Sequence, residues 1–184
     1  MGWLSFILQY VTAPRSVGAV APSSRYLAHK MVRTIDFDTA RCIVEFGPGT
    51  GVFTHEILQR RRLGTVVIAI ERNADFCAQL RRKFATAQDL HIIEGTAERI
   101  GEYLQQHGFD QADYVVSGLP FASLPAEIGA SILTQAKANL HKEGRFITFQ
   151  YSLLRKGLIN RHFRTMEVVR EWRNLPPAYI LSCH

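Results

Sequence analysis

The sequence predicts an α/β fold with a doubly wound, mostly parallel sheet of seven strands. From residue 41 onward, short apolar segments of strand length alternate with segments of helical periodicity, and this alternation is typical of a parallel sheet. The apolar segment 43–46 leads directly into a glycine-rich turn, residues 47–51, which is typical of a strand that passes into a ligand-binding loop. The last two apolar segments, 166–172 and 178–183, flank Asn174-Leu175-Pro176-Pro177, which predicts an antiparallel pair at the sheet edge.

The length and composition fit one domain over residues 1–184. The chain has 184 residues, of which 47% are hydrophobic and 21% charged, so it can bury a sizeable core. Its formal net charge of +6 favours an anionic partner, either RNA or an anionic membrane surface, without choosing between them. The three cysteines lack metal-like spacing, and a sparse set of this kind indicates reduced thiols in a cytosol.

The first segment with helical periodicity covers residues 2–12. Its weakly polar positions form one narrow stripe, and apolar residues that include Trp3 and Tyr10 cover the rest. Such a helix is too short to span a bilayer. It either packs on the domain or on a second copy, or lies in a membrane interface, where Trp and Tyr are favoured. The absence of Lys and Arg from its polar face weakens the membrane interpretation.

Residues 16–34 are expected to cover the ligand of the glycine-rich turn. Small, turn-prone residues come first, and a helix is expected from about Pro22 or Ser23 to Thr34, with the proline at its start. One face of this helix would carry Tyr26, Leu27, Lys30 and Met31.

The remaining elements follow in regular order. Strands are predicted at residues 41–46, 65–70, 91–94, 113–117 and 145–151, ahead of the C-terminal pair. Helices are predicted at residues 52–62, 74–85, 97–106, 125–140 and 154–160.

The glycine-rich turn predicts a nucleotide-type site. Gly47, Gly49 and Gly51 alternate along the chain, so the backbone can turn tightly and approach a ligand that a Cβ would obstruct. The turn also precedes a helix N-terminus, where anions bind well. Dinucleotide enzymes space their glycines as G-x-G-x-x-G. Here the spacing is G-x-G-x-G, and Glu45 precedes it, which suits a cofactor with a cationic amino acid end better than a diphosphate.

These residues resemble the first motif, E/D-x-G-x-G-x-G, of the class I S-adenosylmethionine (SAM) dependent methyltransferases. The resemblance implies SAM as the cofactor, with Glu45, Gly47, Gly49 and Gly51 in its site. A glycine-rich turn without a ligand is the alternative, and it requires three glycines by coincidence.

Two further strand ends complete the expected cofactor site, because ligands of open α/β sheets bind outside the carboxyl ends of the strands. Glu71, followed by Arg72, lies 20 residues after Gly51, where a carboxylate can accept hydrogen bonds from ribose hydroxyls. NAD enzymes also place an acid there, and a helix N-cap is the structural alternative. Thr96 and Ala97 follow the third strand, where related methyltransferases often have Gly-Asp-Ala, so Thr96 and the backbone near Ala97 are expected to contact adenine.

The end of the fourth strand is the expected acceptor site. Ser117-Gly118-Leu119-Pro120-Phe121 resembles the N-L-P-[FY] motif of rRNA adenine methyltransferases, whose Asn accepts a hydrogen bond from the target amine. Gly118 occupies the Asn position, which places adenine in doubt as the acceptor. The carbonyl groups of Ser117, Gly118 or Leu119 remain as hydrogen-bond acceptors, and Ser117 is also expected to contact the cofactor.

A longer resemblance is to the bacterial phospholipid N-methyltransferases. It rests on residues 18–25, the glycine-rich turn, residues 117–121 and Phe149-Gln150-Tyr151 in this order. It implies methylation of phosphatidylethanolamine and its methylated forms at the cytoplasmic face of the membrane, with a phospholipid and an anionic membrane surface as partners. The related rRNA adenine dimethylases carry an additional helical domain after the sheet, whereas this sequence stops where the sheet ends. An RNA or small-molecule methyltransferase and a non-catalytic SAM-binding protein are the alternatives.

The chemistry requires a neutral amine, because its lone pair attacks the methyl group. The ordinary pKa of an alkylammonium group, about 10.4, falls when the group is desolvated. We expect Phe121 and Tyr151 to line the amine and to favour methylated cations with their ring faces, with core packing as the alternative. Six basic residues are candidates for binding a lipid phosphate, with surface solvation as the alternative: Arg25, Lys30, Arg155, Lys156, Arg161 and Arg164. The basic runs 60–62 and 81–83 are expected to be solvated helix faces.

Overall fold

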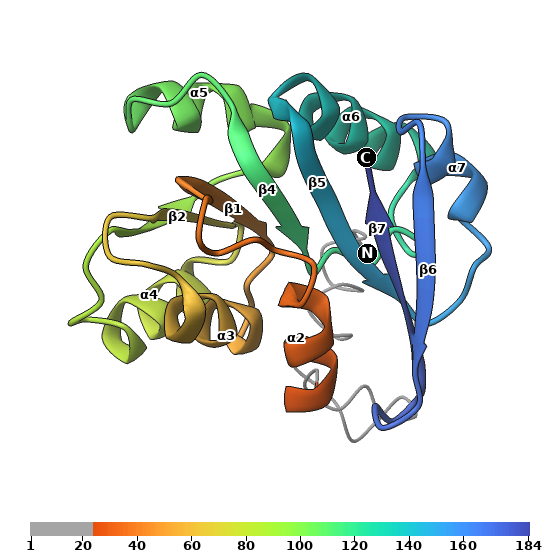
Figure 1. Ribbon diagram of the computed structural model, residues 1–184, viewed down its shortest axis with the longest axis horizontal. Helices are drawn as coiled ribbons and strands as arrows, with labels where there is room; N and C mark the ends of the chain where they lie inside the picture. The colour runs from red at the N-terminus through yellow and green to blue at the C-terminus, as the bar shows by residue number, and fades with distance from the viewer. Residues whose placement is uncertain (1–23) are drawn as a thin grey trace.

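The computed structural model describes residues 24–184, which form one seven-stranded sheet with helices on both faces (Figure 1). The strand order is β3-β2-β1-β4-β5-β7-β6. The first five strands are parallel, and β7 is antiparallel to both β5 and β6. The predicted fold class is confirmed. The predicted helix at 2–12 and the segment 16–23 lie outside the described residues.

The strands agree with the predicted ones in number and order. They are β1 (Cys42–Phe46), β2 (Val66–Glu71), β3 (Leu90–Glu94), β4 (Ala112–Ser117), β5 (Leu140–Gln150), β6 (Met166–Glu171) and β7 (Ala178–Cys183). The fifth strand begins at Leu140, five residues before the predicted start, because Leu140 already pairs with Ala112. The register shifts after that pair, and Gly144 permits it, since a Cβ there would lie 2.6 Å from the Asp113 carbonyl oxygen.

The helices also agree with the prediction apart from their ends. They are α2 (Arg25–Val32), α3 (Val52–Arg60), α4 (Ala74–Lys83), α5 (Ile100–Gln106), α6 (Ala126–Ala138) and α7 (Lys156–Asn160). A 3₁₀ turn, η1 (Ala97–Arg99), replaces the first turn of the helix predicted at 97–106.

The helix α2 differs from its prediction in its start. Its N-cap is Ser24, whose hydroxyl accepts a hydrogen bond from the Leu27 amide at 3.2 Å, so the helix does not begin at a proline. Of the residues predicted to share a face, Leu27 and Met31 are buried, whereas Tyr26 is 42% exposed. The buried residues are Leu27, Ala28, Met31 and Val32, because the sheet lies under that side of the helix.

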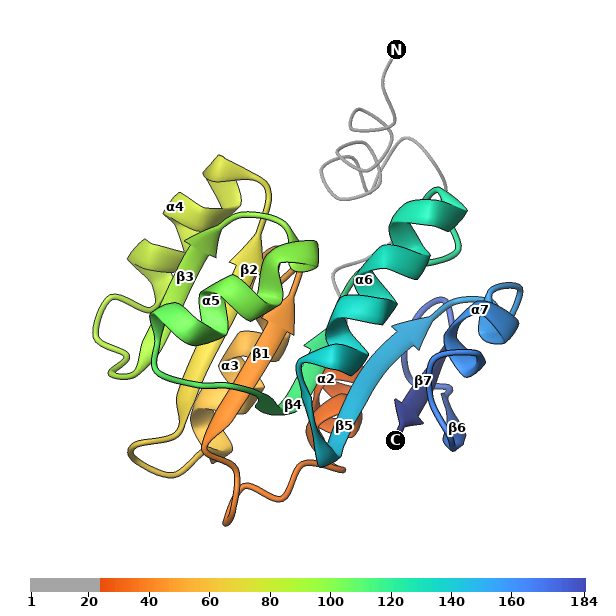
Figure 2. The ribbon, with the colours of Figure 1, turned by 90° about the horizontal axis from the view of Figure 1, so that it is seen from above.

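Two apolar cores lie on opposite faces of the sheet. Side chains of α2 and α3 pack on one face, whereas η1, α5 and α6 pack on the other. Figure 2 shows α5 and α6 along the same face. Among residues 24–184, no helix is long and apolar enough to cross a membrane, and no cluster of His, Cys, Asp or Glu could hold a metal ion. Because β1, β2, β3 and β4 are parallel, their carboxyl ends lie at one edge of the sheet, where the site is expected.

Candidate active site

The glycine-rich turn joins β1 to α3, and its three glycines serve different purposes. All three have positive φ, +63° at Gly47, +53° at Gly49 and +76° at Gly51, a conformation that other residues rarely adopt. A Cβ at Gly47 would lie 2.9 Å from Leu119, and one at Gly51 would lie 2.7 Å from Leu80. No atom lies within 4 Å of a Cβ at Gly49. The outer glycines therefore permit close packing, and Gly49 leaves its side of the turn open to a ligand.

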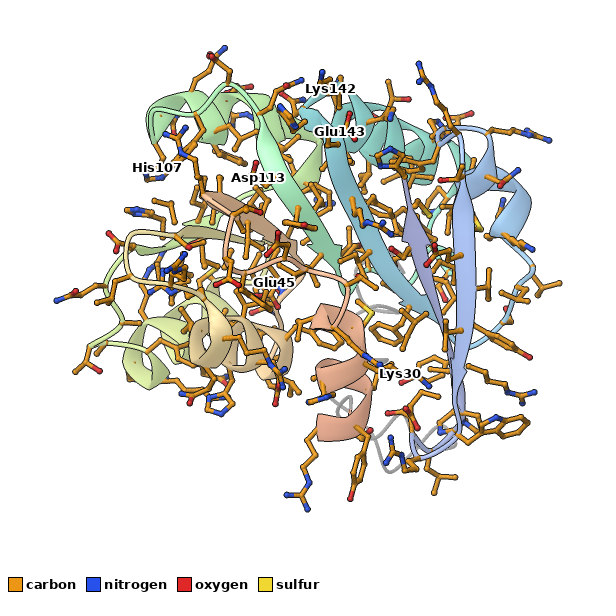
Figure 3. The ribbon with its side chains drawn as sticks, in the orientation of Figure 1. Lys30, Glu45, His107, Asp113, Lys142 and Glu143 are labelled. Carbon is orange, nitrogen blue, oxygen red and sulfur yellow. The ribbon has the colours of Figure 1, made fainter. Side chains whose placement is uncertain are left out.

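Glu45 is fully buried at the end of β1. Its Oε2 accepts a hydrogen bond from the Thr54 hydroxyl of α3 at 2.6 Å. Its Oε1 is buried and has no hydrogen-bond partner among the described residues. Burial raises the pKa of Glu45 from 4.5 to about 7, although the Thr54 hydrogen bond opposes the rise. A buried carboxyl with an unused oxygen is suited to a cation bound nearby. Figure 3 places it between β1 and α3.

Three basic residues of the runs expected to be solvated also donate to backbone carbonyls. The Lys83 ammonium donates to the Thr50 carbonyl within the glycine-rich turn at 2.8 Å. Arg81 donates to the Ile92 carbonyl at 3.0 Å, and Arg61 donates to three backbone carbonyls ahead of β2 and β3. Arg81 and Lys83 are exposed, as expected for solvated helix faces, and Arg61 is partly buried. Each of these long side chains also reaches a backbone carbonyl.

Glu71 connects the turn to the end of β2. Its Oε2 accepts from the Gly49 amide at 3.1 Å, and its Oε1 accepts from the Asn73 amide at 3.0 Å. The N-cap of α4 is Asn73, whose side chain accepts from the amides of Asp75 and Phe76, so Glu71 is not the cap. An ionised carboxylate accepts about four hydrogen bonds, which leaves capacity for two hydroxyl donors.

A cavity of about 210 Å³ opens beside Glu71, between the sheet edge and α6. It brings together six of the predicted site residues: Gly47, Glu71, Arg72, Thr96, Ala97 and Leu119. The lining also includes residues that the sequence analysis did not select: Ile70, Asn73, Gly95, Glu98, Leu124, Ile128 and Ile132. Glu98 accepts a hydrogen bond from the Thr96 hydroxyl. None of the residues of α2 is in the lining, and covering by segment 16–23 stays a prediction.

Gly118 lies where β4 meets the glycine-rich turn. Its amide donates to the Phe46 carbonyl at 2.8 Å. A Cβ at this position would lie 2.8 Å from the Gly47 carbonyl oxygen, which is closer than backbone atoms tolerate. The glycine thus permits the two loops to touch, and an Asn, as in the rRNA adenine motif, would force them apart.

Gln150, the last residue of β5, holds the segment 117–122 at the end of β4, which we call the acceptor loop. The sequence analysis gave it no role in the site. Its Nε2 donates to the Leu119 carbonyl at 3.1 Å and to the Thr148 hydroxyl at 3.3 Å. Its Oε1 accepts from the Ala122 amide at 3.4 Å, and only 4% of the residue is exposed. The signal in the sequence was an amide side chain in an otherwise apolar strand end.

These hydrogen bonds select one carbonyl of the acceptor loop. The Leu119 carbonyl accepts from Gln150 and from the Phe121 amide at 3.0 Å. The Ser117 carbonyl accepts from the Thr148 hydroxyl at 3.2 Å. The Gly118 carbonyl accepts no hydrogen bond within the described part of the chain. Of the three expected carbonyls, Gly118 is therefore the one with free accepting capacity.

The two expected aromatic residues lie in different environments. Phe121 is fully buried, and its ring lies edge-on to Phe146 with centroids 6.1 Å apart, which corresponds to the core-packing alternative. Tyr151 is half-buried, and its ring lies edge-on to Phe149 at 5.5 Å. Neither lines the cavity beside Glu71, so a contact of either ring with an amine stays a prediction.

The basic residues expected to bind a lipid phosphate lie in different environments. The Lys30 ammonium donates to the Arg170 carbonyl at 2.8 Å and lies 3.4 Å from the Glu171 carboxylate, so it joins α2 to β6. Lys156 and Arg161, at the ends of α7, are exposed, and a phosphate contact there stays a prediction.

The fold, the glycine-rich turn and Glu71 define a class I SAM-dependent methyltransferase, and SAM is its cofactor. The chain belongs to the methyltransferase small domain family, whose model matches residues 16–175. It is 36% identical over 180 residues to an ornithine lipid N-methyltransferase of Singulisphaera acidiphila, covering 97% of this chain and 93% of that protein. The protein is an N-methyltransferase.

Two other comparisons support less, one because it covers a short segment and the other because its sequence identity is low. A ribosomal RNA small subunit methyltransferase A of Synechococcus is 38% identical over 58 residues, which is 32% of this chain and 20% of that protein. The crystal structure of Aeropyrum pernix fibrillarin with bound SAM aligns with a TM-score of 0.68 at 13% identity, over 87% of this chain and 76% of that one. The structural match concerns the fold alone.

The described residues fit SAM. The cavity beside Glu71 has apolar walls from α6 that suit an adenine ring, and the unused accepting capacity of Glu71 would suit ribose hydroxyls. The open side of Gly49 and the unused oxygen of Glu45 suit the amino acid end. Bound there, SAM supplies an electrophilic methyl group on its sulfonium.

Proposed function

We propose that this N-methyltransferase methylates the amine of a membrane lipid head group, such as that of phosphatidylethanolamine or of an ornithine lipid. The observation that carries the proposal is the 36% identity to an ornithine lipid N-methyltransferase over 97% of the chain. Because that similarity covers nearly the full length of both proteins, it includes the acceptor end of the site as well as the cofactor end. Phosphatidylethanolamine, its methylated forms and ornithine lipids share a nucleophilic amine on an amphipathic molecule.

In the acceptor loop, a backbone carbonyl rather than a side chain is available to bind the amine. The Gly118 carbonyl can accept a hydrogen bond from the amine N–H and so direct its lone pair toward the methyl group. With SAM bound, the new N–C bond would form as the C–S bond of the sulfonium breaks, and the nitrogen would become a cation. A primary or secondary amine would then lose a proton to solvent, whereas a tertiary amine would give a quaternary ammonium product with no proton to lose. Apolar surroundings favour the neutral amine before attack, and the ring of Tyr151 would stabilise methylated cations.

RNA is the second candidate acceptor, and the similarity to ribosomal RNA methyltransferases A favours it. That similarity extends over 32% of the chain. The close contact between Gly118 and the Gly47 carbonyl argues against an Asn-like contact to an adenine amine.

The test is a transfer assay with methyl-labelled SAM and the full chain. The acceptors are vesicles of phosphatidylethanolamine, vesicles containing ornithine lipid, vesicles of phosphatidylglycerol, which lacks an amine, and total RNA. We expect label in one or both aminolipids and none in phosphatidylglycerol or RNA. Label in RNA alone, or in no lipid, would refute the proposal.

A matched pair of variants shows that the label depends on the site. Glu71→Ala should abolish transfer, because it removes the expected ribose ligand. Glu94→Ala changes an exposed acid at the paired position of β3 that does not line the cavity, and it should leave transfer unchanged.

A further inference from the structure

The turn between β6 and β7 exposes large apolar side chains next to arginines. Trp172 is 66% exposed and Leu175 81% exposed. Tyr26, at the start of α2, is 42% exposed. We call this region the hairpin surface; it consists of Arg25, Tyr26, Arg170, Trp172, Arg173 and Leu175. Figure 1 shows the turn beside the lower end of α2.

Buried polar contacts fix the hairpin surface in place. The Asn174 carboxamide is 2% exposed and accepts from the Ser24 amide at 3.0 Å, while its nitrogen donates to the Pro176 carbonyl at 2.7 Å. Lys30 joins α2 to β6 as described above. Because polar groups hold the turn from inside, its apolar side chains are left to face solvent on a preformed support.

The arginines of this surface lie on aromatic rings. The Arg170 guanidinium lies 3.7 Å from the centroid of Trp172, and the Arg173 guanidinium lies 4.6 Å from that of Tyr26. Glu171 is the acid that faces them, and it is buried and paired with Lys30 and Arg173. The surface is therefore cationic, with aromatic and aliphatic groups among its charges.

The hairpin surface projects from the same edge of the sheet as the active site. β5 ends at Gln150, which pairs with Tyr179 of β7, and Ala178 pairs with Glu171 of β6. The turn 172–177 therefore continues past the carboxyl end of β5. That end is also the one at which Gln150 holds the acceptor loop. A flat partner that touched the turn would lie on the acceptor side of the molecule.

We propose that the hairpin surface docks the enzyme on an anionic phospholipid bilayer, with Trp172 and Leu175 entering the interface and the arginines contacting lipid phosphates. This inference rests on the proposed function, since docking would bring a lipid amine to the acceptor loop. Trp is favoured at membrane interfaces. Exposed apolar groups ringed by cationic groups bind anionic lipid because the apolar groups are buried in the interface and the cations are attracted to the lipid phosphates. Charge complementarity thus selects an anionic bilayer as the partner.

The first test uses Trp172 as a reporter. The sequence has two tryptophans, Trp3 and Trp172, so Trp3→Phe leaves Trp172 alone. With phosphatidylglycerol-containing vesicles, we expect a blue shift of its emission and quenching by brominated acyl chains. Pure phosphatidylcholine vesicles should give a smaller response. Sedimentation with vesicles but unchanged Trp172 emission would overturn the proposal.

Matched substitutions give a second, independent test. Leu175→Ser should weaken vesicle binding, whereas Leu63→Ser, at a leucine that is 94% exposed near the opposite end of the sheet, should not. Arg25→Gln and Arg173→Gln should each weaken binding about fivefold at low salt. Thermal melts confirm that each variant is folded. Equal effects at Leu175 and Leu63 would refute the assignment.

Other partners would give different results. If Leu175→Ser converts a dimer into a monomer without changing vesicle binding, the surface is a contact between copies and the proposal fails. If RNA and not phosphatidylglycerol vesicles protects Trp172 from an aqueous quencher, the proposal also fails. These measurements need no methyl transfer. Binding to vesicles without lipid methylation would therefore refute the proposed function while supporting the hairpin surface.

Discussion

Replacing Glu45 with Gln tests whether the buried carboxyl under the glycine-rich turn is kept for a cation. In the folded protein its pKa is raised to about 7 from 4.5, mainly by burial. The folded state thus holds the proton more tightly than the unfolded state. Below pH 4.5 the group is protonated in both states and does not oppose folding. Between pH 4.5 and 7 the unfolded state releases the proton that the folded state keeps, so the cost of folding grows with pH. It levels off at about 3 kcal/mol above pH 7, where the carboxylate is ionised in both states.

We therefore expect the wild-type protein without SAM to lose stability between about pH 4.5 and 7, and the Glu45→Gln variant to lose less. Above about pH 7 the variant should be more stable by up to about 3 kcal/mol, reduced by the cost of its buried amide hydrogens. Urea unfolding across this pH range measures the difference. Glu143→Gln, a change at an exposed acid of β5, is the control.

Binding of SAM should favour the wild-type protein over the Glu45→Gln variant, which is the reverse of their order of stability without SAM. A cationic amino acid end near Glu45 stabilises its ionised form, so the affinity of wild-type protein for SAM should rise between pH 6 and 8. The affinity of Glu45→Gln should be lower and less dependent on pH, as measured by calorimetry. Parallel stability profiles, or equal SAM affinity in both proteins at pH 8, would refute the reasoning.

The remaining predictions concern the ribose and acceptor ends of the site. Glu71→Ala should weaken SAM binding at least tenfold, because it removes two amide contacts and the expected hydroxyl acceptor; unchanged affinity in calorimetry would exclude a ribose role. Gly118→Ala should destabilise the fold by about 1–3 kcal/mol and reduce turnover, because its Cβ meets the Gly47 carbonyl; a wild-type melting temperature would contradict this. Gln150→Leu should lower kcat about tenfold or more and change the SAM dissociation constant much less, because it releases the Leu119 carbonyl while Gln150 itself does not line the cofactor cavity; an equal loss of SAM affinity would show a general loosening instead.

Local patterns were sufficient for the cofactor half of the protein. The alternation of strands and helices, the spacing of Gly47, Gly49 and Gly51, and the acids at Glu45 and Glu71 all lie within short stretches of sequence. Their meaning depends on backbone conformation and on the common edge of parallel strands. For that reason the fold class, the element order and SAM could be predicted from the sequence.

The acceptor half depended on contacts between distant residues. Gly118 is required by the carbonyl of Gly47, 71 residues earlier, and Gln150 acts on Leu119, 31 residues earlier. No periodicity or local motif encodes such pairs, because they exist only once β1, β4 and β5 lie side by side. The same holds for Phe121, whose aromatic character suited a ligand contact but whose ring the fold places in the core.

The sequence by itself determined the cofactor chemistry of this protein, because the spacing of the glycines and the positions of the two acids suit SAM. The tertiary structure alone decided which carbonyl of the acceptor loop remains available and which surface shares its edge. Ser24 meets Asn174 across 150 residues, and this contact presents Trp172 and Leu175 beside the arginines. Local conformation follows from residue type, whereas the juxtaposition of distant side chains follows from the register of the whole sheet.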